Sequence, residues 1–154
     1  MNKTPLWAAL AAAGALTLAS CGNGGSSGST PAPGHGSPQA AVMGLIRGLA
    51  AHDTNAACGY FVPAEQSLCR GTQLPSTTGS VTIGHTAVSG DKALVVVMSP
   101  KYCIQNQCLS NTNPSKGLPT GSTTFDAAYS ATQNNQSDPT TPCQRVNGKW
   151  YVAG

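Results

Sequence analysis

Apolar and polar positions alternate with a helical period directly after residue 37. Ser37-Pro38 is a typical helix start, because a Ser side chain caps the first turn and Pro fits the first helical position. Apolar residues then occur at i, i+3, i+4 and i+7, namely Val42, Leu45, Ile46 and Leu49. This stripe predicts an amphipathic helix with one buried face. Gly44 and Gly48 weaken the helix, and we interpret them as positions where another backbone comes close.

Two shorter helices are predicted after the first. Asp53 is suited to cap a helix that runs from Thr54 to about Tyr60. Pro63 is suited to begin the next one, with Glu65 in the first turn, where the helix dipole favours a negative charge.

From Val81 onward the apolar positions recur with a period of two, which indicates β-strands. One face of the first strand is expected to carry Val81, Ile83, His85 and Ala87. Residues 89–92 are expected to form a turn. The unbroken apolar run from Ala93 to Met98 then predicts a strand buried on both faces at the centre of a sheet.

Two hairpins are predicted further along the chain. Residues 102–109 form the first, with a cysteine on each arm. The second joins Cys143–Val146 to Lys149–Ala153 through Asn147-Gly148, a pair that suits a tight turn with positive φ at both positions. Between the hairpins lies a polar segment, residues 110–141, in which one short helix is predicted from Phe125 to Ala131. Helices followed by antiparallel strands indicate an α+β domain.

The first 20 residues have the parts of an export signal. Lys3 makes the start positive, and the uncharged run from Leu6 to Leu18 is shorter than the about 20 apolar residues that a bilayer span needs. Leu18-Ala19-Ser20 then precedes Cys21.

These four residues resemble the lipobox of bacterial lipoproteins, of actinobacterial type. The resemblance implies that residues 1–20 are a lipoprotein signal peptide, and that Cys21 carries lipid and becomes the first residue of the mature protein. Acyl chains at Cys21 would hold the chain on the extracytoplasmic face of the cell membrane. Residues 21–38, rich in Gly, Ser and Pro, are expected to form a flexible tether of about 20–25 Å. Residues 39–154 are expected to form a single domain.

Cysteine use agrees with export. Six cysteines occur, and lipid on one of them leaves an odd number in a compartment where disulfides persist. Closeness in sequence favours the pairs Cys58–Cys69 and Cys103–Cys108, with Cys143 left over. In the alternative, Cys143 pairs with Cys103 or Cys108 across a sheet. No Cys-x-x-Cys pair and no His at ligand spacing is present, so we expect no metal site.

Charge excludes one class of partner. Only 8% of residues are charged and the net charge is +3, so polar uncharged side chains must cover most of the surface. The basic residues of the folded part are scattered singly rather than clustered into a footprint for phosphates. We therefore expect no nucleic-acid partner.

The folded part resembles the nuclear-transport-factor-2-like (cystatin-like) domains. The resemblance rests on the opening helix, on Gly90-Asp91-Lys92-Ala93 leading into a Val-rich strand, and on the closing Gly148-Lys149-Trp150-Tyr151-Val152. It implies N-terminal helices packed on a curved antiparallel sheet that forms a cone, here stapled by disulfides. The family includes isomerases and hydrolases, which place an Asp with Tyr or His helpers in the pocket of the cone.

Candidate catalytic residues are few. Asp126 is the one acidic residue without an evident structural role, and His85 lies on a strand face that could line a pocket. No complete catalytic set can be assembled from them, so no catalytic residue is assigned and no cofactor is expected.

Two functions therefore remain open. The first is a non-catalytic envelope module that binds a small ligand or a partner protein. The second is an isomerase- or hydrolase-like enzyme that uses Asp126 with His85 or a Tyr. Trp150 and Tyr151 could contact a partner, but we interpret Trp150 as a core residue of the last strand. For Cys143 we favour a buried, inert thiol over a reactive one.

Overall fold

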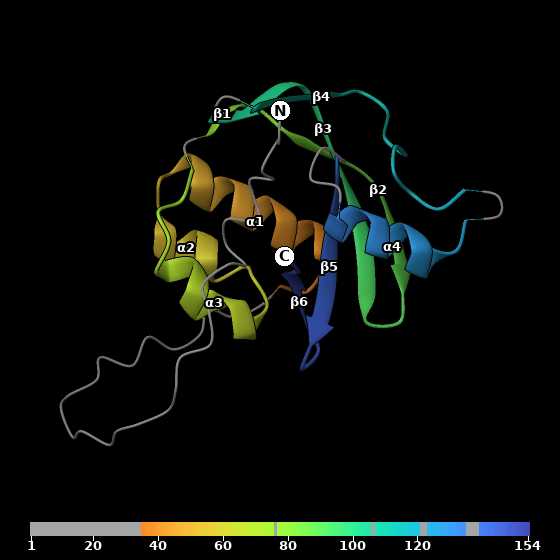
Figure 1. Ribbon diagram of the computed structural model, residues 1–154, viewed down its shortest axis with the longest axis horizontal. Helices are drawn as coiled ribbons and strands as arrows, with labels where there is room; N and C mark the ends of the chain where they lie inside the picture. Colours follow the sequence, from red (N-terminus) through yellow and green to blue (C-terminus); the bar gives the residue numbers. More distant parts are fainter. Residues whose placement is uncertain (1–34, 76, 106, 121–122, 135–138) are drawn as a thin grey trace.

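The computed structural model describes residues 35–75, 77–105, 107–120, 123–134 and 139–154 (Figure 1). The predicted leader, the lipidation site Cys21 and most of the tether lie outside the described residues.

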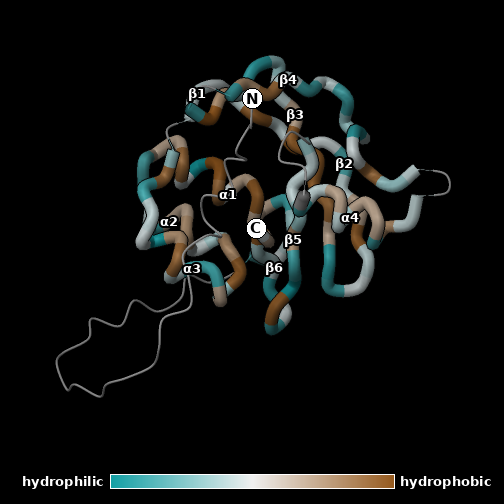
Figure 2. Tube along the Cα trace, in the orientation of Figure 1, coloured by the Kyte–Doolittle hydropathy of each residue, from teal (hydrophilic) through white to brown (hydrophobic). Residues whose placement is uncertain are grey.

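The first helix forms as its pattern predicts. α1 spans Pro38–Ala50, and the Ser37 side chain accepts a hydrogen bond from the Ala40 amide at 3.2 Å. Its buried face includes Val42, Leu45 and Leu49, which pack in the main core. Figure 2 shows α1 coloured largely as hydrophobic.

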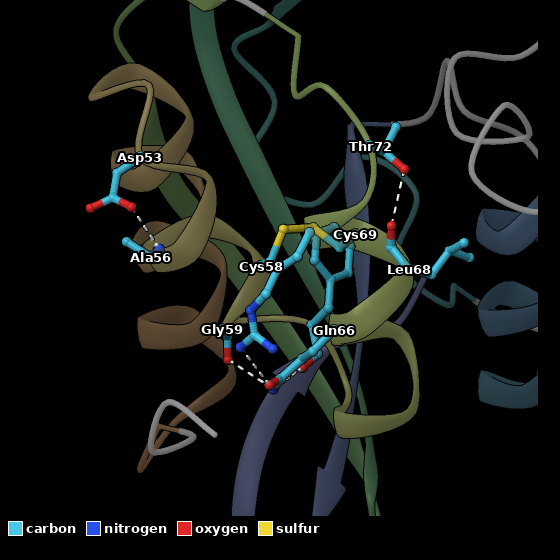
Figure 3. The surroundings of a disulfide bond; sticks show 10 residues. Asp53, Ala56, Cys58, Gly59, Gln66, Leu68, Cys69 and Thr72 are labelled. Carbon is cyan, nitrogen blue, oxygen red and sulfur yellow. Dashed lines mark hydrogen bonds between the residues drawn. A yellow bond between two sulfur atoms is a disulfide. The ribbon is translucent and has the colours of Figure 1, made fainter. Parts of the chain in front are cut away.

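The two short helices are joined by a disulfide. α2 spans Thr54–Cys58, slightly shorter than predicted, and the Asp53 carboxylate caps it by accepting from the Ala56 amide at 2.9 Å. α3 spans Pro63–Arg70. The predicted bridge Cys58–Cys69 is confirmed and ties the two helices together (Figure 3).

The long strand β3, Lys92–Ile104, is the centre of the sheet. It extends well beyond the predicted run of residues 93–98, because its second half forms the first arm of the 102–109 hairpin. Four strands pair with it, all antiparallel: β1 (Thr77–Gly79), β2 (Thr82–Ser89), β4 (Gln107–Asn111) and β5 (Thr140–Val146). The last strand, β6 (Lys149–Val152), pairs with β5. The polar run before Val81 had not indicated β1.

Alternate residues of β3 serve two different cores. Ala93, Val95 and Val97 pack against α1–α3, whereas Leu94 packs on the opposite face against α4 (Phe125–Asn134). The sheet therefore lies between two helical layers, with α1–α3 on one side of β5 and α4 on the other in Figure 1. The predicted short helix is thus confirmed, and it runs to residue 134. The α+β class with helices on an antiparallel sheet is confirmed as well.

A bulge in β2 overturns one detail of the predicted alternation. Ile83 is opposite Val97, but the register then shifts, and Ala87 is opposite Leu94. Ile83 consequently packs with the main core and Ala87 with the α4 core, although a strict period of two places them on the same face. That prediction is wrong for Ala87, because one extra residue reverses the alternation.

The last hairpin closes as predicted. Asn147 and Gly148 both have positive φ, 51° and 80°, as the tight turn requires. The outer edge of β6 is covered by other parts of the chain: Trp150 exchanges two backbone hydrogen bonds with His35, and Val152 bonds to Tyr60 and Val62. This covering removes a free strand edge next to the start of the domain.

The close approach at Gly48 is confirmed and gives a stability prediction. A Cβ at Gly48 would lie 2.6 Å from the Ala57 backbone nitrogen. Helix propensity alone favours Ala over Gly by about 1 kcal/mol. We nevertheless expect Gly48→Ala to lower the free energy of unfolding in urea by about 1–3 kcal/mol, because backbone atoms must move apart.

Gly71→Ala is the matched control. Gly71 follows α3 with φ −77°, and its nearest neighbour to an added Cβ is the Leu68 carbonyl oxygen at 3.5 Å. This variant should stay within about 0.5 kcal/mol of wild type. A Gly48→Ala protein as stable as Gly71→Ala would contradict the packing of α1 on α2.

Candidate functional site

Asp126 lies at the surface, in the first turn of α4. Its carboxylate is 3.3 Å from the Lys92 ammonium, and the two side chains are 81% and 48% exposed. Lys92 also lies 5.2 Å from the centre of the Tyr129 ring. An exposed ion pair of this kind contributes about 0–1 kcal/mol and leaves the carboxylate in water. Asp126 is therefore a solvated carboxylate that contacts Lys92 of β3 from the start of α4.

His85 lies at the bulge of β2 and is also exposed. Its Nδ1 is hydrogen-bonded to the Ser115 hydroxyl at 2.8 Å, and its backbone amide donates to the Pro114 carbonyl at 2.7 Å. These contacts fasten the segment that crosses β2 on its way to α4. In the described part of the chain no hydrogen bond or ion pair joins His85 to Asp126, so the structure does not bring the two candidates together.

Cys143 is the free thiol of the described residues. The bridges Cys58–Cys69 and Cys103–Cys108 are both formed, which excludes the alternative pairing across the sheet. Cys143 is fully buried in β5, with its sulfur 3.8 Å from the Pro38 carbonyl oxygen. Burial raises the pKa of the thiol to about 12. It is therefore protonated and poorly nucleophilic at neutral pH, in line with the expectation of an inert thiol.

Tyr129 is a buried titratable residue that sequence reasoning missed. It packs between α4 and the sheet, and its hydroxyl donates to the Cys143 carbonyl at 3.4 Å. Burial, and then the negative charges that Cys143 and Glu65 can carry, raise its pKa to about 12. The available signal was the i, i+4 pair Phe125 and Tyr129, whose rings stack with centres 5.9 Å apart.

Glu65 lies in the first turn of α3, as predicted, and is half-buried. One carboxylate oxygen accepts the Gly154 amide at 3.2 Å. Burial raises the pKa of Glu65, and this hydrogen bond opposes the shift. The side chain thus connects α3 to the residues after β6.

The space between α1–α3 and the sheet is occupied by packed apolar side chains. Trp150 is 6% exposed and joins this core, as predicted, with the Arg145 guanidinium 5.5 Å above its ring. Tyr151 is buried on the other face against Val62. Neither ring is therefore presented as a surface for a partner.

The described residues contain no group of three or more His, Cys, Asp or Glu side chains that could hold a metal ion. Within the same residues no helix has the length and apolar character needed to cross a membrane. No family model, curated protein or solved structure matches the chain.

The buried Tyr129 hydroxyl gives a prediction for alkaline pH. Its pKa is about 12 in the folded protein against a usual value of 10.0, so the unfolded chain loses this proton first. Its contribution to stability is therefore complete below pH 10 and is lost as pH rises toward 12. In urea unfolding between pH 8 and 11, Tyr129→Phe should lose stability less steeply than wild type.

Cys143→Ala is the companion variant. The Cys143 pKa is raised from 9.0 to about 12 by burial, so this variant should also flatten the alkaline decline, beginning one pH unit lower. An equally steep decline in wild type and both variants would show that these two groups are not the ones titrating.

Proposed function

We propose that this protein is a lipid-anchored module on the extracytoplasmic face of the cell membrane, where it binds a partner without catalysing a reaction. Lipid on Cys21, after Leu18-Ala19-Ser20, supplies the anchor. Residues 22–34 add a tether that holds the domain close to the bilayer. The partner is a small ligand or another protein of the envelope, and we favour the protein.

The two disulfides support export. Cys58–Cys69 and Cys103–Cys108 each join neighbouring elements of the described fold. Such bridges form and persist outside the reducing cytoplasm. With these four cysteines paired and Cys143 buried, lipid on Cys21 accounts for the remaining thiol of the chain.

The environment of Asp126 carries the preference for binding over catalysis. A carboxylate that acts as an acid or base is typically shielded from water and perturbed by its neighbours. Asp126 is instead solvated and paired with Lys92, while His85 is bonded to Ser115 on a different element. Both candidate side chains thus have structural roles.

The packed interior favours a protein partner. Side chains of α1, α2, β3, β5 and β6 fill the space where a cone-shaped domain of the cystatin-like type would hold a ligand. We propose that cone as the finer description of the fold, and the arrangement of α1 against β3, β5 and β6 supports it. α4, on the opposite face of the sheet, is an element added to that cone. Contacts with a partner would then involve the outer surface.

Replacing Cys21 tests the anchor. Wild type expressed in a bacterial host that processes lipoproteins should fractionate with membranes and incorporate labelled fatty acid. Cys21→Ala should remain unprocessed or become soluble, and it should incorporate no label, because the acylated thiol is gone. Cys143→Ala is the control and should behave as wild type. Continued acylation of the Cys21→Ala protein would contradict the proposal.

The binding half is tested with Asp126→Asn and His85→Gln. Membranes that carry wild type are treated with a crosslinker, and residues 22–154 are purified for mass spectrometry of bound small molecules. The proposal expects one reproducible partner or ligand that both variants retain. Turnover of a bound molecule by wild type, abolished in both variants, would instead establish the isomerase- or hydrolase-like alternative.

A further inference from the structure

The two disulfides differ in how easily solvent reaches them. Cys58 and Cys69 are 0% and 3% exposed, and both belong to the main core between the helices and the sheet. In the other bridge Cys103 is 8% exposed, whereas Cys108 is an exposed residue of β4. An attacking thiolate must approach a sulfur atom of the bridge, so accessibility limits the rate of exchange. Of the two bridges, only Cys103–Cys108 includes a cysteine that is exposed to solvent.

The two bridges also differ in the interactions that stabilise the elements around them. Cys58–Cys69 joins α2 and α3, two short helices that depend on packing against each other. Figure 3 shows this bridge beside the buried Gln66, whose amide donates to the carbonyls of Gly59 and Phe61 at 3.2 and 2.9 Å. Opening this bridge would disturb the packing of α2 and α3 on each other.

Cys103 and Cys108, in contrast, are opposite each other in a ladder that is held by backbone hydrogen bonds. The neighbouring pairs Tyr102↔Leu109 and Ile104↔Gln107 continue the same register, and Cys103 is also opposite Thr78 of β1 on the other edge of β3. The cysteines are only five residues apart, against eleven in the other bridge, so this bridge restricts the unfolded chain less. The hairpin thus has a backbone ladder on both sides of the bridge.

We propose that Cys103–Cys108 is a thiol–disulfide exchange site that reacts with an external dithiol, while Cys58–Cys69 is purely structural. The dithiol is a small molecule or a protein with two neighbouring cysteines. This inference concerns the folded domain and does not rest on the lipid anchor or on the partner proposed above.

The exchange proceeds in two substitutions. A thiolate of the dithiol attacks the Sγ of Cys108, the exposed residue of the pair, and forms a mixed disulfide. The Cys103–Cys108 bond breaks, and its electron pair leaves on the Cys103 sulfur, which takes a proton from water. The second thiolate of the dithiol then attacks the first sulfur of the same dithiol, which is bonded to Cys108 in the mixed disulfide. The external disulfide forms, and the Cys108 thiolate is released and protonated. Two electrons reduce the bridge and the dithiol is oxidised; the reverse sequence restores the bridge.

Selective reduction tests the site within one molecule. The oxidised, folded chain (residues 22–154) is treated with dithiothreitol, quenched with acid at intervals and alkylated for peptide mass spectrometry. We expect Cys103 and Cys108 to be labelled at least tenfold faster than Cys58 and Cys69, with the near-ultraviolet circular dichroism of the core unchanged. Equal rates, faster opening of Cys58–Cys69, or labelling only together with loss of the dichroism signal would overturn the proposal.

A pair of single variants tests the direction of attack. Cys103→Ser leaves the exposed Cys108 thiol and Cys108→Ser leaves the buried Cys103 thiol, and both lack the same bridge. Cys103→Ser should form a mixed disulfide with oxidised glutathione, a linear small-molecule disulfide, or with a protein disulfide at least tenfold faster than Cys108→Ser. Equal or reversed rates would contradict attack at Cys108. If Cys103→Ser reacts with both disulfides, a protein dithiol can be the exchange partner. If it reacts with the small-molecule disulfide alone, the exchange partner is a small molecule.

Discussion

The structure depends on the double-sided pairing of β3. Its segment from Ala93 to Val97 is buried on both faces, so every backbone amide and carbonyl there needs a partner within the protein. β2 pairs with this segment on one edge and β5 on the other. At Val97 the amide donates to the Pro139 carbonyl, and the carbonyl accepts from the Asn111 side-chain amide. An unpaired buried backbone group costs about 1–3 kcal/mol, so neither edge can be left open. With both edges paired, Val95 packs in the core beneath α1–α3, and Leu94 packs against α4 on the opposite face.

Local chemistry was sufficient to predict the elements that have local causes. The Ser37 and Asp53 caps, the turn at Asn147-Gly148 and the central Val-rich strand all depend on residues a few positions apart, and all are present. Features caused by distant residues were not predictable. The bulge in β2 accompanies the approach of Pro114 to Gly84, thirty residues away, and no period within the strand contains that information.

The same distinction separates the site residues. Cysteine spacing indicated both bridges, because each joins elements that are adjacent in sequence. Asp126 was selected as a candidate because no local role was evident for it, but its role is the contact with Lys92, which lies on β3. Tyr129 was missed for the complementary reason: its burial depends on β5. In the described residues, Asp126, Tyr129 and Glu65 each contact another part of the fold.

Native-state hydrogen exchange measures the central claim most directly. The amides of Ala93 to Val97 should exchange only through global unfolding, with protection equal to the full free energy of unfolding. Amides of α4 and of the Cys103–Cys108 hairpin should open at lower free energy, because each is attached to one side or one end of β3. Protection that is greatest in α4 or in the hairpin, with faster exchange along Ala93 to Val97, would contradict the account.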